Sequence, residues 1–127
     1  MAGTLNVRTY VGLTDLGHSP PLSVSYTITG VDEFCHYYSD LATVTSIAID
    51  VGAVNVVQSV SVYLITGGTT AATGLSVDLS TATWAATDFV LLQGEMITIR
   101  PTGTTFSVKN LNTSTASFEV FVCGDNA

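Results

Sequence analysis

Short runs in which apolar residues alternate with serine and threonine recur along this chain. In the first clear run, Val24, Tyr26 and Ile28 alternate with Ser25 and Thr27. The same period of two recurs in later runs, whose apolar members are Val60, Val62 and Leu64, then Ile97 and Ile99, then Phe118, Val120 and Val122. Successive side chains of a β-strand point to opposite faces, so this period predicts strands with one apolar face that enters a core and one hydroxyl-bearing face.

Nine runs are rich in Val, Ile, Thr, Tyr or Phe and are separated by Gly, Pro, Asn and Asp, the residues that favour turns. The predicted strands are Leu5–Val11, Leu22–Ile28, Glu33–Tyr38, Thr45–Val51, Val56–Ile65, Leu75–Leu79, Met96–Arg100, Phe106–Asn110 and Ser117–Cys123. Closely spaced short strands are typical of sandwiches and barrels. We therefore expect one all-β domain over residues 1–127, an antiparallel, jelly-roll-like β-sandwich of about eight strands, with residues 1–11 as an N-terminal arm or first strand.

The chain has few charges for a soluble domain. Asp, Glu, Lys and Arg make up only 10% of the residues, whereas 46% are apolar; charged residues usually make up roughly 25% of a soluble domain. A domain of this size cannot hide that much apolar surface by itself. We therefore expect part of the surface to be covered in a homo-oligomer, with a trimer as the working expectation, or in a larger assembly.

The charges that are present exclude several partners. The net charge is −7, and the only bases are Arg8, Arg100 and Lys109. These scattered bases form no stripe that could neutralise phosphates, and an anionic membrane would repel the chain, so we expect neither nucleic acid nor membrane as a partner. The first residues do not form a secretory signal, and no stretch reaches the roughly 18 apolar residues of a membrane span. Synthesis in a cytoplasm is the expectation.

Residues 32–40, with the sequence DEFCHYYSD, form the stretch with the most chemically active side chains. On a strand, Phe34, His36 and Tyr38 share one face, whereas Cys35 and Tyr37 share the other. Adjacent Cys35 and His36 therefore cannot form a nucleophile–base dyad. A metal at His36 with Asp32 or Asp40 is a weaker interpretation than a strand with aromatic packing. Neither a nucleophile elbow nor a phosphate-binding glycine motif occurs, so we expect no enzyme, no cofactor and no metal site.

Three other features leave alternatives open. Cys35 and Cys123 are either buried free thiols or a disulfide. Residues 80–88 form either a single helical turn capped by Ser80 or a long loop. Within that segment Trp84, the only tryptophan, either plugs one end of the sandwich or faces solvent as a contact residue. Residues 67–74, which are small and rich in Gly and Thr, are predicted to form a long exposed loop.

The C-terminal half resembles a known class of proteins. The stretch Phe89–Pro101 combines leucines, a Gly-Glu turn, an apolar strand and a proline, and it is followed by the short strand of Phe106–Asn112 and the Val-rich strand of Ser117–Val122. This layout resembles small all-β phage virion proteins of the capsid decoration (cement) or tail accessory type. The resemblance implies a sandwich that sits on a virion and contacts its neighbours, without catalytic residues.

Our first hypothesis is therefore a structural protein of a phage particle, most specifically a capsid decoration protein. It would be made in the host cytoplasm, reside in the virion and bind the major capsid protein or another virion protein. The candidate contact residues are Leu5, Val7, Tyr10, Pro20, Pro21 and Trp84.

Two alternatives remain. One is a carbohydrate-binding module of a phage tail or adhesin, in which Tyr37, Tyr38 and Trp84 would stack on sugars and Asp40 would grip hydroxyl groups. The other is a structural subunit of a tail or tube, which would need the same composition.

Overall fold

The computed structural model describes residues 3–11 and 22–126, and every regular element in them is a β-strand. The strands are β1 (Gly3–Val11), β2 (Leu22–Val31), β3 (Glu33–Leu41), β4 (Ser46–Ala48), β5 (Val56–Thr66), β6 (Leu75–Asp78), β7 (Phe89–Leu91), β8 (Met96–Ile99), β9 (Ser107–Asn110) and β10 (Ala116–Asp125). The predicted all-β, antiparallel class is confirmed. The described residues hold ten strands rather than about eight. All nine predicted runs contain strands, and the additional strand β7 lies in the continuously apolar run of residues 89–92, which has no alternation to reveal it.

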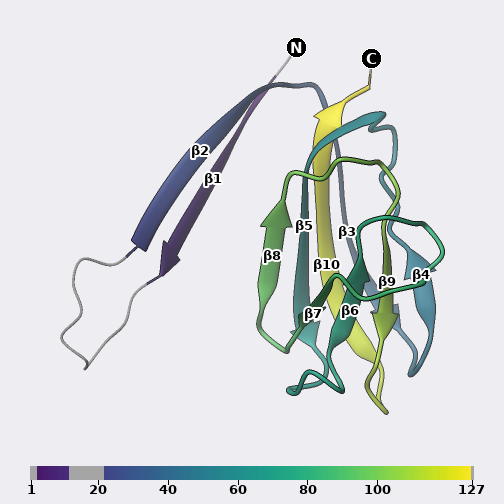
Figure 1. The fold of residues 1–127 in the computed structure, drawn as a ribbon. Helices are drawn as coiled ribbons and strands as arrows, with labels where there is room; N and C mark the ends of the chain where they lie inside the picture. Colours follow the sequence, from purple (N-terminus) through teal and green to yellow (C-terminus); the bar gives the residue numbers. More distant parts are fainter. Residues whose placement is uncertain (1–2, 12–21, 127) are drawn as a thin grey trace.

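Eight of these strands form two four-stranded sheets that lie face to face, as Figure 1 shows. The first sheet has the order β3-β10-β5-β8, and the second has the order β4-β9-β6-β7. Apolar side chains from both sheets fill the space between them. The largest fully buried ones are Phe106, Phe118, Leu64, Leu75, Val60, Val62, Val77, Val108, Val120 and Val122. The inward positions predicted for β5 and β10 thus lie in the core.

The strand pairs of this sandwich are nested along the chain. The first strand, β3, pairs with the last, β10, and β4 pairs with β9. Likewise β5 pairs with β8, and β6 pairs with β7, all antiparallel. The eight strands therefore resemble one long hairpin folded over two sheets. This pairing brings residues far apart in sequence, such as His36 and Phe121, directly opposite each other.

Strands β1 and β2 form a separate two-stranded sheet, which we call the arm (residues 3–11 and 22–31). The arm projects from the end of the sandwich (Figure 1) and is joined to β3 through Asp32. The backbone N–H of Asp32 donates to the Gly124 carbonyl (3.0 Å), and the Asn126 N–H donates to the Asp32 carboxylate (3.1 Å). The root of the arm is therefore fixed to the end of β10.

The position of the arm corrects one expectation. One face of residues Leu22–Ile28 was expected to enter the core, and Ile28 is buried, but Tyr26 remains 41% exposed. Alternation shows which side chains share a face, but not whether another element covers that face.

The segment 67–74 also differs from the prediction of a long exposed loop. Gly68 and Gly74 are buried, although residues 69–72 are exposed. A Cβ atom on Gly68 would lie 1.8 Å from the Thr73 carbonyl oxygen, so the backbone closes on itself at this point. The segment is a compact turn whose glycines permit a close backbone approach.

Candidate functional site

The outer face of the first sheet carries aromatic side chains that the sandwich core does not use. On β3, Phe34, His36 and Tyr38 point outward, in alternation with the half-buried Cys35 and Tyr37. Phe34 is 63% exposed and Tyr38 is 66% exposed. Neighbouring exposed apolar side chains with polar groups around them mark interaction sites more often than isolated ones do.

A hydrogen-bonded group stands at the centre of this face. Nε2 of His36 lies 2.6 Å from Oε2 of Glu119 on β10, and Tyr38 lies directly opposite Glu119 in the pairing of β3 with β10. The hydrogen bonds from His36 and then Tyr38 hold the pKa of Glu119 below its ordinary value. The same bond to Glu119 raises the pKa of the Tyr38 hydroxyl. The carboxylate is therefore ionised at neutral pH, and the contact with His36 holds it in place.

Aromatic rings adjoin this carboxylate. Phe34 and Phe121 stack with ring centroids 6.1 Å apart and an interplanar angle of 22°. The His36 ring meets Phe121 edge-on, with centroids 5.7 Å apart and an angle of 66°. Such offset and edge-to-face contacts fix ring orientation. Phe121 thus has a defined position beside Glu119.

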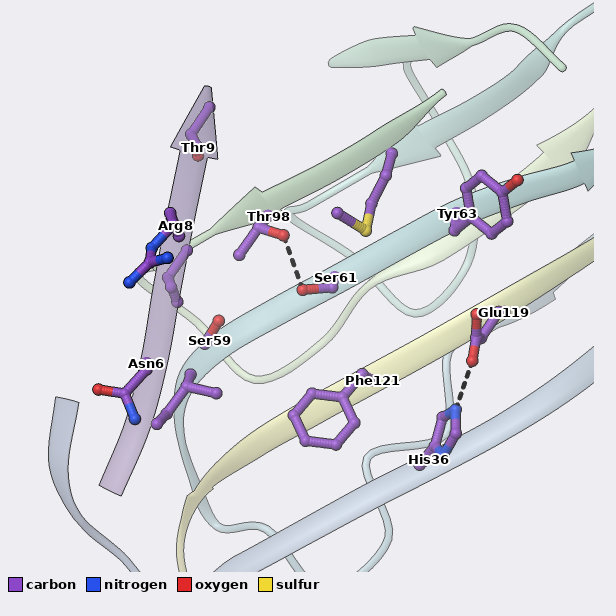
Figure 2. A pocket seen from close by; sticks show the side chains of 13 residues that line it. Asn6, Arg8, Thr9, His36, Ser59, Ser61, Tyr63, Thr98, Glu119 and Phe121 are labelled. Atoms are coloured by element: carbon purple, nitrogen blue, oxygen red, sulfur yellow. Dashed lines mark hydrogen bonds and ion pairs between the residues drawn. The ribbon is translucent and has the colours of Figure 1, made fainter. Parts of the chain in front are cut away.

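The arm diverges from this face, and a cleft of about 380 Å³ lies between β1 and the first sheet. Figure 2 shows β1 as one wall, with the strands of the first sheet as the other. The lining residues are Leu5, Asn6, Val7, Arg8, Thr9, His36, Ser59, Ser61, Tyr63, Met96, Thr98, Glu119 and Phe121. We call this the arm cleft.

The two serine hydroxyl groups that β5 contributes to the arm cleft differ in their hydrogen bonding. The Ser61 hydroxyl lies 2.9 Å from that of Thr98 on β8, so these two groups satisfy each other. Ser59 is only 1% exposed, and its Oγ has no hydrogen-bond partner among the described residues. Buried hydroxyl groups usually have a partner, so the Ser59 Oγ is available to a bound molecule or a water.

The sequence alone did not single out Ser59, Glu119 or Phe121. Alternation in Ser117–Val122 does place Glu119 and Phe121 on one face of a strand. Their neighbours depend on the pairing of Glu119 with Tyr38 and of Phe121 with His36, which joins distant parts of the chain. Alternation therefore identifies the residues that share a face of β10, but it does not identify the strand that pairs with β10.

The predicted contact residues lie in different places. Leu5 and Val7 are half-buried on β1 and line the arm cleft. Tyr10 belongs to β1, but its side chain lies outside the described part, and Pro20 and Pro21 lie outside the described residues. Trp84 is half-buried over the second sheet, away from the cleft. Its indole N–H donates to the Ser76 hydroxyl (3.0 Å).

The predicted sugar-stacking residues do not come together. Tyr38 lies on the outer face of the first sheet, whereas Tyr37 points to the other face and its hydroxyl accepts the Asp50 N–H (3.0 Å). Trp84 lies near the other sheet, with the Lys109 Nζ 4.3 Å from its ring centroid. The Asp40 carboxylate accepts a hydrogen bond from Ser117 (2.6 Å).

The segment 80–88 is a loop, not a helical turn, and a buried carboxylate organises it. Asp78 is 1% exposed. Its Oδ1 accepts both the N–H (2.9 Å) and the hydroxyl (2.7 Å) of Ser80, and its Oδ2 accepts the N–H groups of Ala85 (3.1 Å) and Ala86 (3.0 Å). Ser80 therefore donates to Asp78 instead of capping a helix. These bonds, with the Ser80 hydroxyl first, hold the pKa of Asp78 far below its usual range.

The two cysteines are free thiols on opposite faces of the first sheet. Cys35 on β3 points toward the core with Tyr37, whereas Cys123 on β10 shares the outward side of Phe121 and is buried beneath neighbouring residues. Adjacent strands with side chains on opposite faces cannot be bridged without moving the backbone. Burial raises the pKa of both thiols, with a further contribution from Asp50 at Cys35.

The described residues contain no cluster of three His, Cys, Asp or Glu side chains positioned to hold a metal ion. A search of the same residues for a helix long and apolar enough to cross a membrane found none.

Comparison with known proteins gave no family model, curated protein or solved structure that matches this chain.

Proposed function

We propose that this protein is a structural protein of a phage particle, specifically a capsid decoration protein that binds the outer surface of the shell. The observation that carries the proposal is the nested pairing of β3 with β10, β4 with β9, β5 with β8 and β6 with β7. This pairing supports a jelly roll, an eight-stranded double sheet common in viral capsid proteins. The resemblance of the C-terminal half to small all-β virion proteins favours the same role.

The arm supports the same role through its marginal stability. An isolated two-stranded hairpin is marginally stable in water and gains from packing on another surface. The arm strands have nine and ten residues, which corresponds to about 30 Å at roughly 3.3 Å per residue. Tyr26 on the arm is exposed. An arm of this length could reach a neighbouring subunit and bury its apolar side chains there.

The low charge of the chain fits a permanent contact. Interface cores that persist are more apolar and carry fewer charges than the rest of a protein surface. The proposed mechanism is mechanical: a rigid sandwich and its arm cover seams between shell subunits and resist their separation. The proposed partner is the major capsid protein or another virion protein, and copies of this chain would contact each other as a homo-oligomer.

Co-sedimentation tests the proposal. Particles of the phage that encodes the chain, assembled without it, would be mixed with the purified protein. We expect saturable binding, and we expect deletion of residues 3–31 to weaken it at least ten-fold. The core residues all lie outside the arm, so the shortened chain should still fold.

A matched pair of point variants distinguishes specific binding through the arm from non-specific adsorption to the shell. Tyr26→Asp changes an exposed side chain on the arm, whereas Ile47→Asp changes an equally exposed one on β4 of the second sheet. Weak binding by the Tyr26 variant and normal binding by the Ile47 variant support arm contact. Absence of binding to the shell overturns the decoration role, and binding to purified tails instead would assign the chain to the tail or tube.

A further inference from the structure

We propose that the arm cleft is a binding site for a neutral saccharide of one or two rings. This inference is independent of the decoration role, because it depends only on groups within one chain. The cleft volume of about 380 Å³ lies at the lower end of the range for pockets that bind small ligands, roughly 300–1,000 Å³. A saccharide offers apolar ring faces and many hydroxyl groups, and the cleft contains partners for both.

The acceptor for sugar hydroxyls is Glu119. The 2.6 Å contact with His36 holds its carboxylate in one position, so a ligand does not have to orient it. An ionised carboxylate has about four lone-pair sites. The bond to His36 uses one of them, so sites remain for hydroxyl donors. Hydrogen bonds to an ionised acceptor are roughly twice as strong as neutral ones.

The apolar platform is Phe121. Its contacts with Phe34 and His36 fix the ring in place beside Glu119. Tyr63 and Met96 extend the apolar lining along β5 and β8, and Met96 is 64% exposed. A ring face beside a fixed carboxylate matches the two faces of a sugar, one of C–H groups and one of hydroxyl groups.

The most specific indication is Ser59. Its hydroxyl is buried and lines the cleft, and it lacks a hydrogen-bond partner among the described residues. Such a group is unfavourable unless something bonds to it. A sugar hydroxyl in the cleft would supply that bond, whereas an apolar ligand would leave the group unsatisfied.

Charge limits the class of sugar. The lining contains one cation, Arg8 on β1, and one ionised carboxylate, Glu119. These charges balance, while the chain as a whole carries −7. Polyanionic glycans are therefore disfavoured, and a neutral ring is favoured.

Saturation-transfer NMR and titration on the full chain test the proposal, with glucose, galactose, N-acetylglucosamine, maltose, cellobiose and lactose as probes. We expect at least one to bind with a Kd below about 10 mM, an affinity typical of weak recognition. Glu119→Gln and Phe121→Ala should each weaken that binding about ten-fold. Phe89→Ala changes an exposed aromatic on β7 of the second sheet and should leave it unchanged.

Ser59→Ala should lower the affinity for the sugar without lowering the stability of the fold. Removing an unsatisfied buried hydroxyl should leave the melting temperature unchanged or raise it, yet sugar affinity should fall several-fold. Failure of all six sugars to bind overturns the proposal. Sugar binding that is unaffected by the changes at Ser59, Glu119 and Phe121 also overturns the proposal, because the sugar would then lie elsewhere. The proposal is likewise overturned if the cleft binds only another protein or a second copy of this chain.

Discussion

Nε2 of His36 lies 2.6 Å from Oε2 of Glu119, and this contact joins β3 to β10 across the outer face of the first sheet. The two residues are far apart in sequence, and the pairing of β3 with β10 brings them together. The contact fixes a carboxylate at the rim of the arm cleft, so its geometry can be tested through the ionisation of Glu119.

Replacing His36 by Ala should raise the pKa of Glu119 toward its ordinary value of 4.5, because the largest cause of its lowering is then removed. Tyr38→Phe should raise it by a smaller amount. Both pKa values can be followed by NMR titration of the Glu119 side-chain carboxyl carbon. An unchanged pKa in the His36 variant would show that the two side chains do not meet in solution.

Asp78 should be the carboxylate whose loss most affects stability. Asp78→Ala removes an acceptor of four hydrogen bonds and leaves the N–H groups of Ala85 and Ala86 without it. We expect the free energy of unfolding to fall by about 2–3 kcal/mol, the scale of lost bonds to a charged group. The control Asp50→Asn alters an exposed carboxylate that accepts one bond from the Gly52 N–H (2.8 Å), and its effect should stay below about 1 kcal/mol in urea unfolding.

Asp78 should also make the fold sensitive to acid. Its pKa in the folded chain lies far below the ordinary value of 3.8, so the unfolded chain takes up a proton at a higher pH than the folded chain does. The stabilisation by Asp78 is therefore complete above about pH 5 and declines as the pH falls through 3.8 and below. Urea unfolding of wild type and Asp78→Asn between pH 7 and pH 2 should give curves that converge at low pH. A constant difference would contradict the ionised carboxylate.

The cysteines should remain reduced in the folded protein. Because Cys35 and Cys123 lie on opposite faces of the first sheet, an oxidant should not form a disulfide between them within one chain. A thiol assay in denaturant should find two thiols per chain after aerobic purification. In the native protein both should react slowly, because burial raises the pKa of each thiol. A mass lower by two hydrogens would contradict this assignment.

Local patterns in the sequence predicted much of the sandwich. Alternation correctly located the strands of the core and placed Phe34, His36 and Tyr38 on one face of β3. It could not show that the arm stands apart from the core, because the exposure of Tyr26 depends on what lies opposite it. Strand β7 lies in the continuously apolar run of residues 89–92, which shows no alternation.

The candidate site depended on long-range pairing and was therefore harder to predict. Glu119 and Phe121 are adjacent to His36 only because β10 pairs with β3 in one register. Similarly, Asp78 lies within the predicted strand Leu75–Leu79, and its hydrogen bonds form only because the loop from Ser80 to Ala86 folds back over β6. Spacing along the chain carries no information about either relationship.

The composition of purified virus particles tests the central proposal most directly. The proposal implies that a phage encodes this chain, and quantitative mass spectrometry of the particles of that phage would measure the copy number of the chain relative to the major capsid protein. A decoration protein should be present at a fixed ratio, with many copies per particle. A chain that lacks the arm should be absent from the particles. Its absence from particles in which the major capsid protein is fully represented would contradict the proposed function.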